Sequence, residues 1–328
     1  MRQLSVKSHK GSYDVLIESG LLKKLKLYMN PDLFYVIIAD DMIPIEYIND
    51  VKNACPDHLL IHFPAGELSK SMTEFSRIID ILVNHNIRKD AVVVSIGGGV
   101  TGDLSGFVAS TYSRGLDFIQ IPTTLLSQID SSVGGKVAIN TTGAKNIIGS
   151  IYPPKKVLID PLTLNTLDKR QINAGMAEMI KYGMIADKSF FEKIKNEDPS
   201  KDWDYYIYKS LEIKKRYVEA DEFDNSLRQS LNFGHTIGHA LETYYEYKKY
   251  LHGEAVSIGM VQILSNPQIK KELIDCLKKY NLPTSDPVSF DELKIYINRD
   301  KKGRKDLLKI VDVTEIGNSV IVKSQFKL

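Results

Sequence analysis

Three histidines lie close together near the middle of the second half of the chain and could hold a metal ion. His235 and His239 are four residues apart, so they share one face of a helix, and His252 follows soon after. Histidine is the commonest metal ligand, and a catalytic zinc ion takes three protein ligands and leaves other positions open. The segment is not H-E-x-x-H, so it lacks the general base of a metalloprotease. The alternative is three hydrogen-bonded core histidines. Spacing leaves the accompanying carboxylate open among Glu178, Glu242 and Glu254.

A second pair of groups, Glu178 and Lys181, stands three residues apart in a predicted helix and therefore on one face. On a solvated surface such an ion pair contributes less than about 1 kcal/mol. Its neighbours here, 174–177 and 179–180, are small or apolar. A charged pair in a partly buried wall favours a functional role over a surface pair.

Glycines follow a buried strand in the first half of the chain. The apolar run Ala91–Ile96 leads directly into Gly97–Asp103, whose glycines fit the dinucleotide spacing G-x-G-x-x-G. Glycine lets the backbone approach a phosphate closely, and the amides that follow attract negative charge. The acid that normally binds the ribose about 20 residues later is missing, since Asp117 precedes the next strand. We predict a nucleotide phosphate site, with a plain strand-to-helix turn as the alternative.

Hydroxyl, amide and ammonium groups crowd the stretch 123–146. Such groups suit phosphate or polyhydroxy recognition. A solvated loop would explain any single serine or threonine, but Val133, Val137 and Ile139 indicate a packed segment.

The first half must provide a sheet that positions these groups. Short β-rich runs alternate with helical patterns such as Ser71–Asn84, which predicts a largely parallel sheet covered by helices. Asp40, Glu67, the glycine run and Thr123–Thr124 each come just after a predicted strand, where ligands of such sheets bind. The predicted strands are Tyr13–Ile17, Phe34–Ala39, Leu59–Phe63, Ala91–Ile96, Phe118–Ile121 and Lys156–Ile159.

After Asp160 the pattern becomes mainly helical. We therefore predict two domains, 1–160 with an α/β fold and 161–328 mainly α-helical, with a ligand between them. The predicted helices of the second domain are Lys169–Ile185, Tyr205–Glu222, Gly234–Tyr247 and Glu254–Leu264.

Bulk properties are those of an ordinary soluble protein. The chain has 328 residues, 43% of them hydrophobic and 26% charged, and a net charge of +2, which gives no sign of a nucleic-acid or membrane partner. Two distant cysteines, Cys55 and Cys276, form no disulfide framework, so we expect a reducing cytoplasm. No signal-type stretch opens the chain, and no apolar run reaches the roughly 18 residues of a membrane span.

The motifs together, in this order along the chain, resemble the 3-dehydroquinate synthase family, NAD- and metal-dependent cyclases of the shikimate pathway. The resemblance covers about residues 66 to 303, and it implies a Rossmann-like first domain and a helical second one. The matching segments are Gly97–Asp103, Tyr112–Gly115, Ile121–Leu126 with Gln128 and Asp130, Ser131–Lys136, Gly143–Asn146, Ala177–Gly183, Leu231–Thr236 with Gly238–His239, and His252–Glu254.

The resemblance also implies roles for single residues. Glu178, His235 and His252 match the ligands of Zn²⁺ or Co²⁺. Arg114 matches an arginine that reaches the substrate phosphate of a neighbouring subunit, which implies a homodimer. The NAD contacts would be Asp40, Gly66, Glu67, Lys70, Gly99, Val100, Thr101, Gly102, Asp103, Thr123, Thr124, Lys136, Lys145, Thr163, Leu164, Asn165 and Thr166. The substrate-binding and catalytic set would be Lys136, Asn146, Lys181, Lys214, Arg228, Asn232, His239 and Lys301, with Arg114 and Asp130.

The implied reaction converts 3-deoxy-D-arabino-heptulosonate 7-phosphate into 3-dehydroquinate and phosphate. NAD takes a hydride from C5, phosphate leaves by β-elimination, the hydride returns, and an intramolecular aldol step closes the ring. The metal would polarise the C5 oxygen, and His239 would relay a proton. The substrate's own phosphate could take the C6 proton.

Two departures and three alternatives accompany this interpretation. The chain meets Asn266–Pro267 earlier than the family pattern does, and Ala65 stands where the family often has a polar residue. The alternatives are a polyol or glycerol-phosphate dehydrogenase, a cyclase that makes inosose or valiolone rings, and a non-enzymatic cofactor-binding protein. Against the first two stands the joint presence of Lys136, Lys145, Asn146, Lys214, Arg228 and Asn232.

Overall fold

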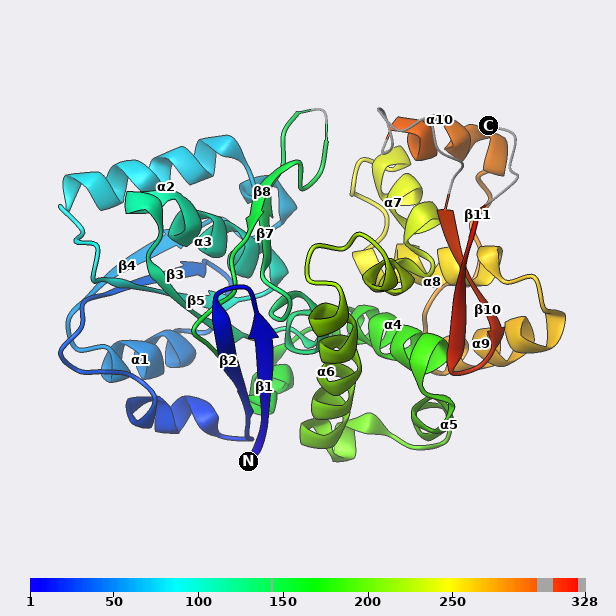
Figure 1. Ribbon diagram of the computed structural model, residues 1–328, viewed down its shortest axis with the longest axis horizontal. Helices are drawn as coiled ribbons and strands as arrows, with labels where there is room; N and C mark the ends of the chain where they lie inside the picture. Colours follow the sequence, from blue (N-terminus) through cyan, green and yellow to red (C-terminus); the bar gives the residue numbers. More distant parts are fainter. Residues whose placement is uncertain (143, 300–308, 324–328) are drawn as a thin grey trace. The chain divides into compact units, whose positions relative to one another are not determined.

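The computed structural model describes residues 1–142, 144–299 and 309–323 and divides into two compact units (Figure 1). The first unit comprises Met1–Leu167 with Trp203–Lys215, and the second comprises Asp168–Asp202 with Arg216–Leu328. The division therefore falls shortly after the predicted boundary at residue 160. The assignment of 203–215 to the first unit has no counterpart in the prediction from sequence.

The first unit contains a seven-stranded sheet with the order β1-β2-β9-β6-β5-β3-β4. β1 pairs antiparallel with β2, and every other neighbouring pair is parallel, so the predicted fold class is confirmed. A separate antiparallel hairpin joins β7 to β8. The strands are β1 (Arg2–Ser8), β2 (Gly11–Ile17), β3 (Tyr35–Asp40), β4 (His58–Phe63), β5 (Val92–Gly97), β6 (Asp117–Pro122), β7 (Lys136–Ile139), β8 (Ile148–Ile151) and β9 (Lys156–Ile159).

Helices and short helical turns connect these strands. Ser71 caps α2, because its Oγ accepts a hydrogen bond from the Glu74 N–H at 3.3 Å, and the predicted helix Ser71–Asn84 is thereby confirmed. The helical segments are η1 (Leu21–Leu27), α1 (Ile45–Ala54), η2 (Glu67–Ser69), α2 (Met72–Asn84), α3 (Gly99–Thr111), η3 (Tyr112–Arg114), the π-helical turn η4 (Ser127–Ser131) and η5 (Pro161–Thr166).

Two apolar clusters cover the two faces of the sheet. Ile37 and Val94 pack with η1 and α1 on one face, while Ile38 and Val93 pack with α2 and α3 on the other. Figure 1 shows α1 on the opposite side of the sheet from α2 and α3. Successive strand residues point to opposite faces, so strands covered on both sides are apolar throughout. This sandwich fixes the carboxyl ends of the strands.

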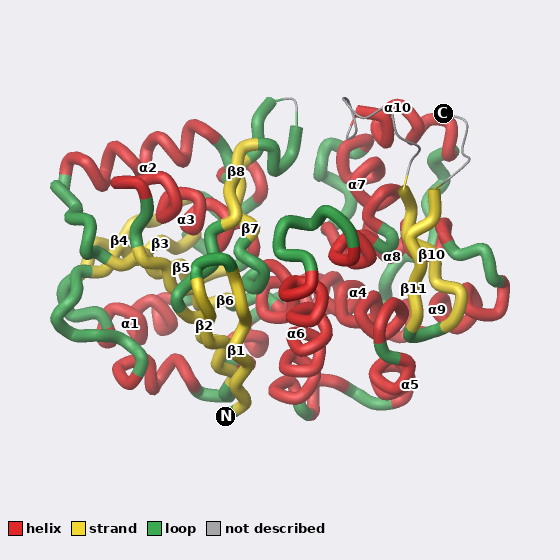
Figure 2. Tube along the Cα trace, in the orientation of Figure 1, coloured by secondary structure: helices red, strands yellow, loops and turns green. Residues whose placement is uncertain are grey.

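The second unit is mainly helical and contains the antiparallel hairpin β10–β11 (Figure 2). In the described part of the chain, no helix has the length and apolar character needed to cross a lipid bilayer. The segments are α4 (Lys169–Ala186), α5 (Lys188–Asn196), η6 (Pro199–Lys201), α6 (Trp203–Ala220, which begins in the first unit), η7 (Leu227–Asn232), α7 (His235–Tyr244), α8 (His252–Ile263), α9 (Pro267–Lys279), α10 (Phe290–Arg299), β10 (Lys309–Glu315) and β11 (Asn318–Lys323).

The break at Asn266–Pro267 separates two helices. α8 ends at Ile263, and Pro267 is the first residue of α9. Asn266 caps α9, since its Oδ1 accepts hydrogen bonds from the N–H groups of Gln268 (2.9 Å) and Ile269 (3.3 Å). The proline thus ends one helix, as predicted, and also starts the next.

Candidate active site

The glycine run forms the turn between β5 and α3. Gly97 closes the strand, Gly98 precedes the helix, and α3 begins at Gly99. A side chain at Gly97 would not fit, because its Cβ would lie 2.3 Å from Thr101 Oγ1. The first N–H groups of a helix have no acceptor within it and attract anions. The backbone of Gly97–Asp103 therefore has the form that a phosphate site requires.

Other predicted cofactor residues lie at the same edge of the sheet. Asp40, at the carboxyl end of β3, accepts a hydrogen bond from the Thr101 hydroxyl, with 2.9 Å between Oδ2 and Oγ1. Thr123 follows β6, and its N–H donates to the Gly97 carbonyl at 2.9 Å. Because β3, β5 and β6 are adjacent and parallel, their carboxyl ends meet there, as the sequence predicted.

A polar cluster in the first unit joins predicted cofactor and substrate residues. Lys70 is buried, and its ammonium group contacts the Asp103 carboxylate and the Asn146 amide oxygen. Lys145 Nζ lies 3.6 Å from Glu67 Oε1. Burial raises the pKa of Asp103, and the Lys70 ammonium opposes that rise. Residues far apart in sequence are thereby brought together.

The segment after β9 adds two threonine hydroxyls to the first unit. Thr163 is buried, and its Oγ1 accepts a hydrogen bond from Gln128 Nε2 at 2.9 Å. Thr166 Oγ1 lies 3.1 Å from the Tyr47 hydroxyl. The remaining predicted cofactor positions are Gly66 (φ +109°) before η2, Val100 and Gly102 in α3, Thr124 after β6, and Leu164 and Asn165 in η5.

Three helices of the second unit bring together one glutamate and two histidines. Glu178 on α4 has its Oε1 3.6 Å from His235 Nε2 on α7 and 3.7 Å from His252 Nε2 at the start of α8. One ligand atom from each residue lies within 4.8 Å of the others. Among the described residues, Glu178 Oε1 has no hydrogen-bond partner although the side chain is fully buried. A buried carboxylate oxygen left in this way costs free energy unless a cation binds it, so this trio fits a divalent metal.

Hydrogen bonds on the far side of each ring aim the two histidines. His235 Nδ1 lies 3.1 Å from the Phe233 carbonyl, and His252 Nδ1 lies 3.3 Å from Glu242 Oε2. Burial lowers the pKa of His235 well below its usual value, and the Lys181 ammonium lowers it further. A neutral ring with its proton on Nδ1 presents the Nε2 lone pair, which is the form that binds a metal.

Lys181 and His239 stand beside this trio. The Lys181 ammonium contacts Glu178 Oε2, and only 1% of Lys181 is exposed, so the pair is a buried one as predicted. The His239 ring centre lies 5.4 Å from that of His235 and 5.8 Å from that of His252. His239, Glu242 and His252 form a second group whose ligand atoms lie within 4.8 Å.

Glycines let the three helices approach closely. A Cβ at Gly253, next to His252, would lie 1.9 Å from the Ala174 carbonyl oxygen, one helical turn before Glu178. A Cβ at Gly259 on α8 would lie 2.0 Å from the Gly234 carbonyl oxygen, just before α7. Close packing of α8 against α4 and α7 therefore depends on the missing side chains.

The other predicted site residues have varied surroundings. In the first unit, the Lys214 ammonium contacts the Asp130 carbonyl and its Oδ1, the latter at 2.7 Å. In the second unit, Arg228 is buried, and its guanidinium donates to the Glu222 carbonyl at 2.7 Å. Lys136, Arg114 and Asn232 are exposed, and Arg114 has a left-handed φ of +65°. Lys301 lies outside the described residues.

The three glutamates that the sequence offered as metal ligands differ in their partners in the structure. Glu254 binds Arg170, with Oε1 2.6 Å from Nε and Oε2 2.7 Å from the terminal nitrogen, and is therefore not part of the metal group. Glu242 contacts the far side of His252 instead. Sequence analysis missed Arg170, because a pair 84 residues apart leaves no local spacing signal.

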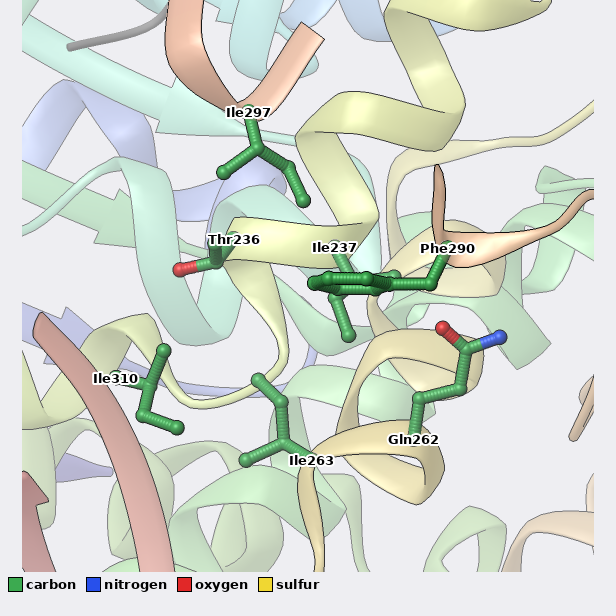
Figure 3. A pocket seen from close by; sticks show the side chains of 7 residues that line it. All are labelled: Thr236, Ile237, Gln262, Ile263, Phe290, Ile297 and Ile310. Carbon is green, nitrogen blue, oxygen red and sulfur yellow. The ribbon is translucent and has the colours of Figure 1, made fainter. Parts of the chain in front are cut away.

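A cavity of about 290 Å³ in the second unit lies between α7, α8, α10 and β10 (Figure 3). The side chains of Ile237, Ile263 and Phe290 point toward one another in it. Thr236 and Gln262 are its polar lining residues, and none of its described lining residues is titratable. The cavity is thus no candidate for the catalytic centre.

Comparison with known proteins agrees with these features. Residues 60–174 match the family described as 3-dehydroquinate synthase N-terminal, and residues 175–303 match 3-dehydroquinate synthase C-terminal. The chain is 42% identical to the 3-dehydroquinate synthase of Clostridium botulinum, over 98% of this chain and 97% of that one. It is 40% identical to that of Streptococcus suis, over 97% and 96%.

A solved structure shares the fold. The 2-epi-5-epi-valiolone synthase of Streptomyces hygroscopicus, with NAD⁺ and Zn²⁺ bound, is 25% identical and has a TM-score of 0.86, covering 95% of this chain and 92% of that one. The two family matches together span most of the sequence, and the curated relatives align over nearly all of it. The chain therefore belongs to the 3-dehydroquinate synthase family.

Proposed function

We propose that this chain converts 3-deoxy-D-arabino-heptulosonate 7-phosphate into 3-dehydroquinate and phosphate, as a phosphate-eliminating lyase that depends on NAD⁺ and a divalent metal. The observation that carries the proposal is the group Glu178, His235 and His252, with a buried carboxylate oxygen left without a protein partner. Three ligands leave a coordination position open, as catalytic metal sites do, whereas structural zinc sites have four protein ligands.

Glu178, His235 and His252 would hold Zn²⁺ or Co²⁺. Three protein ligands would leave a coordination position open for the substrate, as catalytic zinc sites do. When bound, the ion supplies Lewis-acid polarisation of the C5 oxygen. Lys181 neutralises the second oxygen of Glu178, so the carboxylate can face the ion without a further partner.

The first unit would hold NAD⁺ at the carboxyl ends of β3, β5 and β6. The N–H groups at the start of α3 suit the pyrophosphate, and Asp40 suits the adenosine ribose. When bound, the nicotinamide supplies reversible hydride acceptance. Residues Glu67, Lys70 and Lys145 would line the same site.

Cationic and amide side chains would bind the substrate's carboxylate and phosphate. Ammonium and guanidinium groups form the strongest hydrogen bonds with such anions, and holding both ends fixes the reacting carbons in place. These side chains would be Lys136, Asn146, Lys181, Lys214, Arg228, Asn232 and Lys301, with Asp130 orienting Lys214.

His239 would move the proton of the C5 hydroxyl. Its ring lies on the same face of α7 as His235, one helical turn further on, and is half-buried. An imidazole next to a substrate hydroxyl can take its proton and later return it. No other described histidine lies beside the group.

Arg114 would act in a neighbouring subunit of a homodimer. It is exposed at the end of η3, where Ser113 and Arg114 both have positive φ, 49° and 65°. An exposed side chain is accessible to a second copy of the chain, and a two-fold interface would supply two such arginines reciprocally.

The compartment that we propose is the cytoplasm. Cys55 and Cys276 are both buried free thiols, and burial raises the pKa of each to about 12. Two inert thiols need no oxidising environment.

The proposal is tested by following phosphate release and absorbance at 340 nm with a catalytic amount of NAD⁺ and either Zn²⁺ or Co²⁺. We expect many equivalents of phosphate for each NAD⁺, with no steady growth of NADH. Steady NADH growth with glycerol or another polyol would favour the dehydrogenase alternative. Turnover of a different sugar phosphate in its place would favour another cyclase.

A further inference from the structure

Glu242 is a buried carboxylate to which the proposed reaction gives no role. It lies on α7 three residues after His239 and seven after His235, so all three side chains share one face of that helix. Only 3% of Glu242 is exposed. A polar side chain so deeply buried needs a hydrogen-bond partner to offset its lost hydration.

That partner includes His252. Glu242 Oε2 lies 3.3 Å from His252 Nδ1, while His252 Nε2 on the other side of the ring lies 3.7 Å from Glu178 Oε1. A neutral imidazole has one N–H and one lone pair, so a hydrogen bond that Nδ1 donates to a carboxylate oxygen leaves the lone pair on Nε2. The carboxylate thus selects the tautomer that faces the metal group.

We propose that Glu242 is a positioning residue that aims His252 at the metal. His252 is the first residue of α8 and is about a quarter exposed, with 26% of its side chain accessible, so the helix alone restrains its ring weakly. His235 makes the equivalent hydrogen bond, which its Nδ1–H donates to the Phe233 carbonyl at 3.1 Å. In both histidines, a hydrogen bond at Nδ1 orients the ring so that Nε2 faces Glu178. The acceptor is the Phe233 carbonyl for His235 and Glu242 for His252. This inference rests on the proposed metal site.

The rival interpretation makes Glu242 itself a ligand of a second ion with His239 and His252, whose ligand atoms also lie within 4.8 Å. For both ions to bind, the His252 ring would have to lose its remaining proton and bridge them, which a neutral imidazole does not do. Among the described residues of the two groups, the buried carboxylate oxygen without a hydrogen-bond partner is Glu178 Oε1, whereas Glu242 Oε2 has His252 as a partner. One ion and one orienting carboxylate explain both observations.

The test measures the affinity of the metal-stripped full chain for Zn²⁺ by competition with a chromophoric chelator. We expect Glu242→Gln to weaken Zn²⁺ binding by about 10–100-fold and Glu242→Ala to weaken it further, because removing an orienting partner typically costs that much. The matched control is Glu246→Gln, an exposed glutamate near the end of α7 whose partner is Lys248. The thermal midpoint of the metal-free Glu242→Gln chain should equal that of the control.

Several outcomes would overturn the inference. The inference is wrong if Glu242→Gln binds Zn²⁺ as tightly as the unaltered chain does. It is also wrong if the unaltered chain binds two Zn²⁺ ions and the variant binds only one. If the variants do not fold, nitrogen NMR of the unaltered zinc-loaded chain decides instead. Zn²⁺ on Nε2 of His252 with a proton on Nδ1 supports the inference, and Zn²⁺ on Nδ1 contradicts it. If the unaltered chain binds neither Zn²⁺ nor Co²⁺, the proposed function fails first.

Discussion

The individual residues of the second unit derive their chemistry from burial. Glu178 is fully buried beside Lys181, and its Oε1 has no hydrogen-bond partner among the described residues. Burial lowers the pKa of His235, so a neutral ring faces this carboxylate. Each of these groups would be unfavourable alone. Together they form a site whose electrostatic cost a divalent cation would relieve.

A first prediction concerns His252. The variant His252→Ala removes one of three ligands, so we expect metal affinity to fall by more than about 100-fold and activity to fall with it, since even an orienting partner costs 10–100-fold. The side chain is partly exposed, so the thermal midpoint of the metal-free chain should change little. Bound zinc, phosphate release and thermal unfolding are measured together, with the exposed His85→Ala as control. Full activity with unchanged zinc content would contradict the site.

Sequence predicted part of this site from local spacing. The i, i+3 pair Glu178–Lys181 and the i, i+4 pair His235–His239 share helix faces, and the structure confirms both placements. The choice of Glu178 over Glu242 and Glu254 came only from resemblance to a family. It depends on packing of α4 against α8, which no local pattern records.

At the level of elements, glycines determine how close the helices of the metal group come. Gly253 faces the Ala174 carbonyl on α4, and Gly259 faces the Gly234 carbonyl before α7. Helices with ordinary side chains pack about 8–10 Å apart, and glycines reduce that distance. The apolar residues around them explain why such helices associate, but the glycines decide which side chains meet.

We therefore expect Gly253→Ala to separate α8 from α4. Its Cβ would lie 1.9 Å from backbone oxygen, so the helix must shift and carry His252 away from Glu178. The expected cost is about 1–3 kcal/mol of unfolding free energy, together with weaker Zn²⁺ binding. Urea unfolding and chelator competition measure both, with the exposed Gln262→Ala on the same helix as control. Zn²⁺ binding equal to that of the control would show that the close approach is unnecessary.

A carboxylate network holds the loop that leads from α7 to α8. Asp286 accepts hydrogen bonds from the Tyr245 hydroxyl (2.9 Å), the Tyr250 hydroxyl (2.5 Å), the Lys249 ammonium (2.7 Å) and the Val288 N–H (2.9 Å). Burial raises the pKa of Asp286, but the hydrogen bonds from Lys249 and Tyr250 outweigh it and lower the pKa to about 2. Sequence gave no sign of this network, because its members belong to separate segments.

This lowered pKa predicts a pH dependence. Because the folded pKa lies below the unfolded value near 4, ionised Asp286 stabilises the fold above about pH 4, and that contribution is lost as the pH falls toward 2. Asp286→Asn should therefore lose about 1–2 kcal/mol at pH 7 and progressively less below pH 4. Urea unfolding of the variant is compared with the exposed Asp291→Asn. An equal loss at pH 7 and pH 3 would contradict the assignment.

At the level of the whole molecule, sequence predicted a parallel sheet followed by helices because period-2 and period-3.6 patterns are local. The six predicted strands coincide with β2, β3, β4, β5, β6 and β9, with small differences at the ends. The antiparallel strand β1 and the hairpin β10–β11 were not predicted, since their pairing partners determine them. The assignment of 203–215 to the first unit likewise depends on tertiary contacts.

The proposed homodimer makes a prediction about mixed subunits. Arg114→Ala and His252→Ala chains should each be nearly inactive, but refolding them together at equal amounts should restore about a quarter of wild-type activity. Half of randomly mixed dimers contain one chain of each kind, and each of these holds one intact site. The control is a mixture of Lys181→Ala and His252→Ala chains. Both substitutions lie in the second unit of their own chain, so a mixed dimer would hold no intact site. No recovery beyond that control would mean that Arg114 serves its own chain.

In the proposed reaction, a hydride removed from the substrate returns to it within one turnover. The most direct measurement uses substrate carrying deuterium at C5, with a catalytic amount of unlabelled NAD⁺ and Zn²⁺, and follows the label by mass spectrometry. We expect 3-dehydroquinate to retain the deuterium and reduced cofactor not to accumulate. Deuterium collecting in NADH, with an oxidised ketone as the released product, would contradict it.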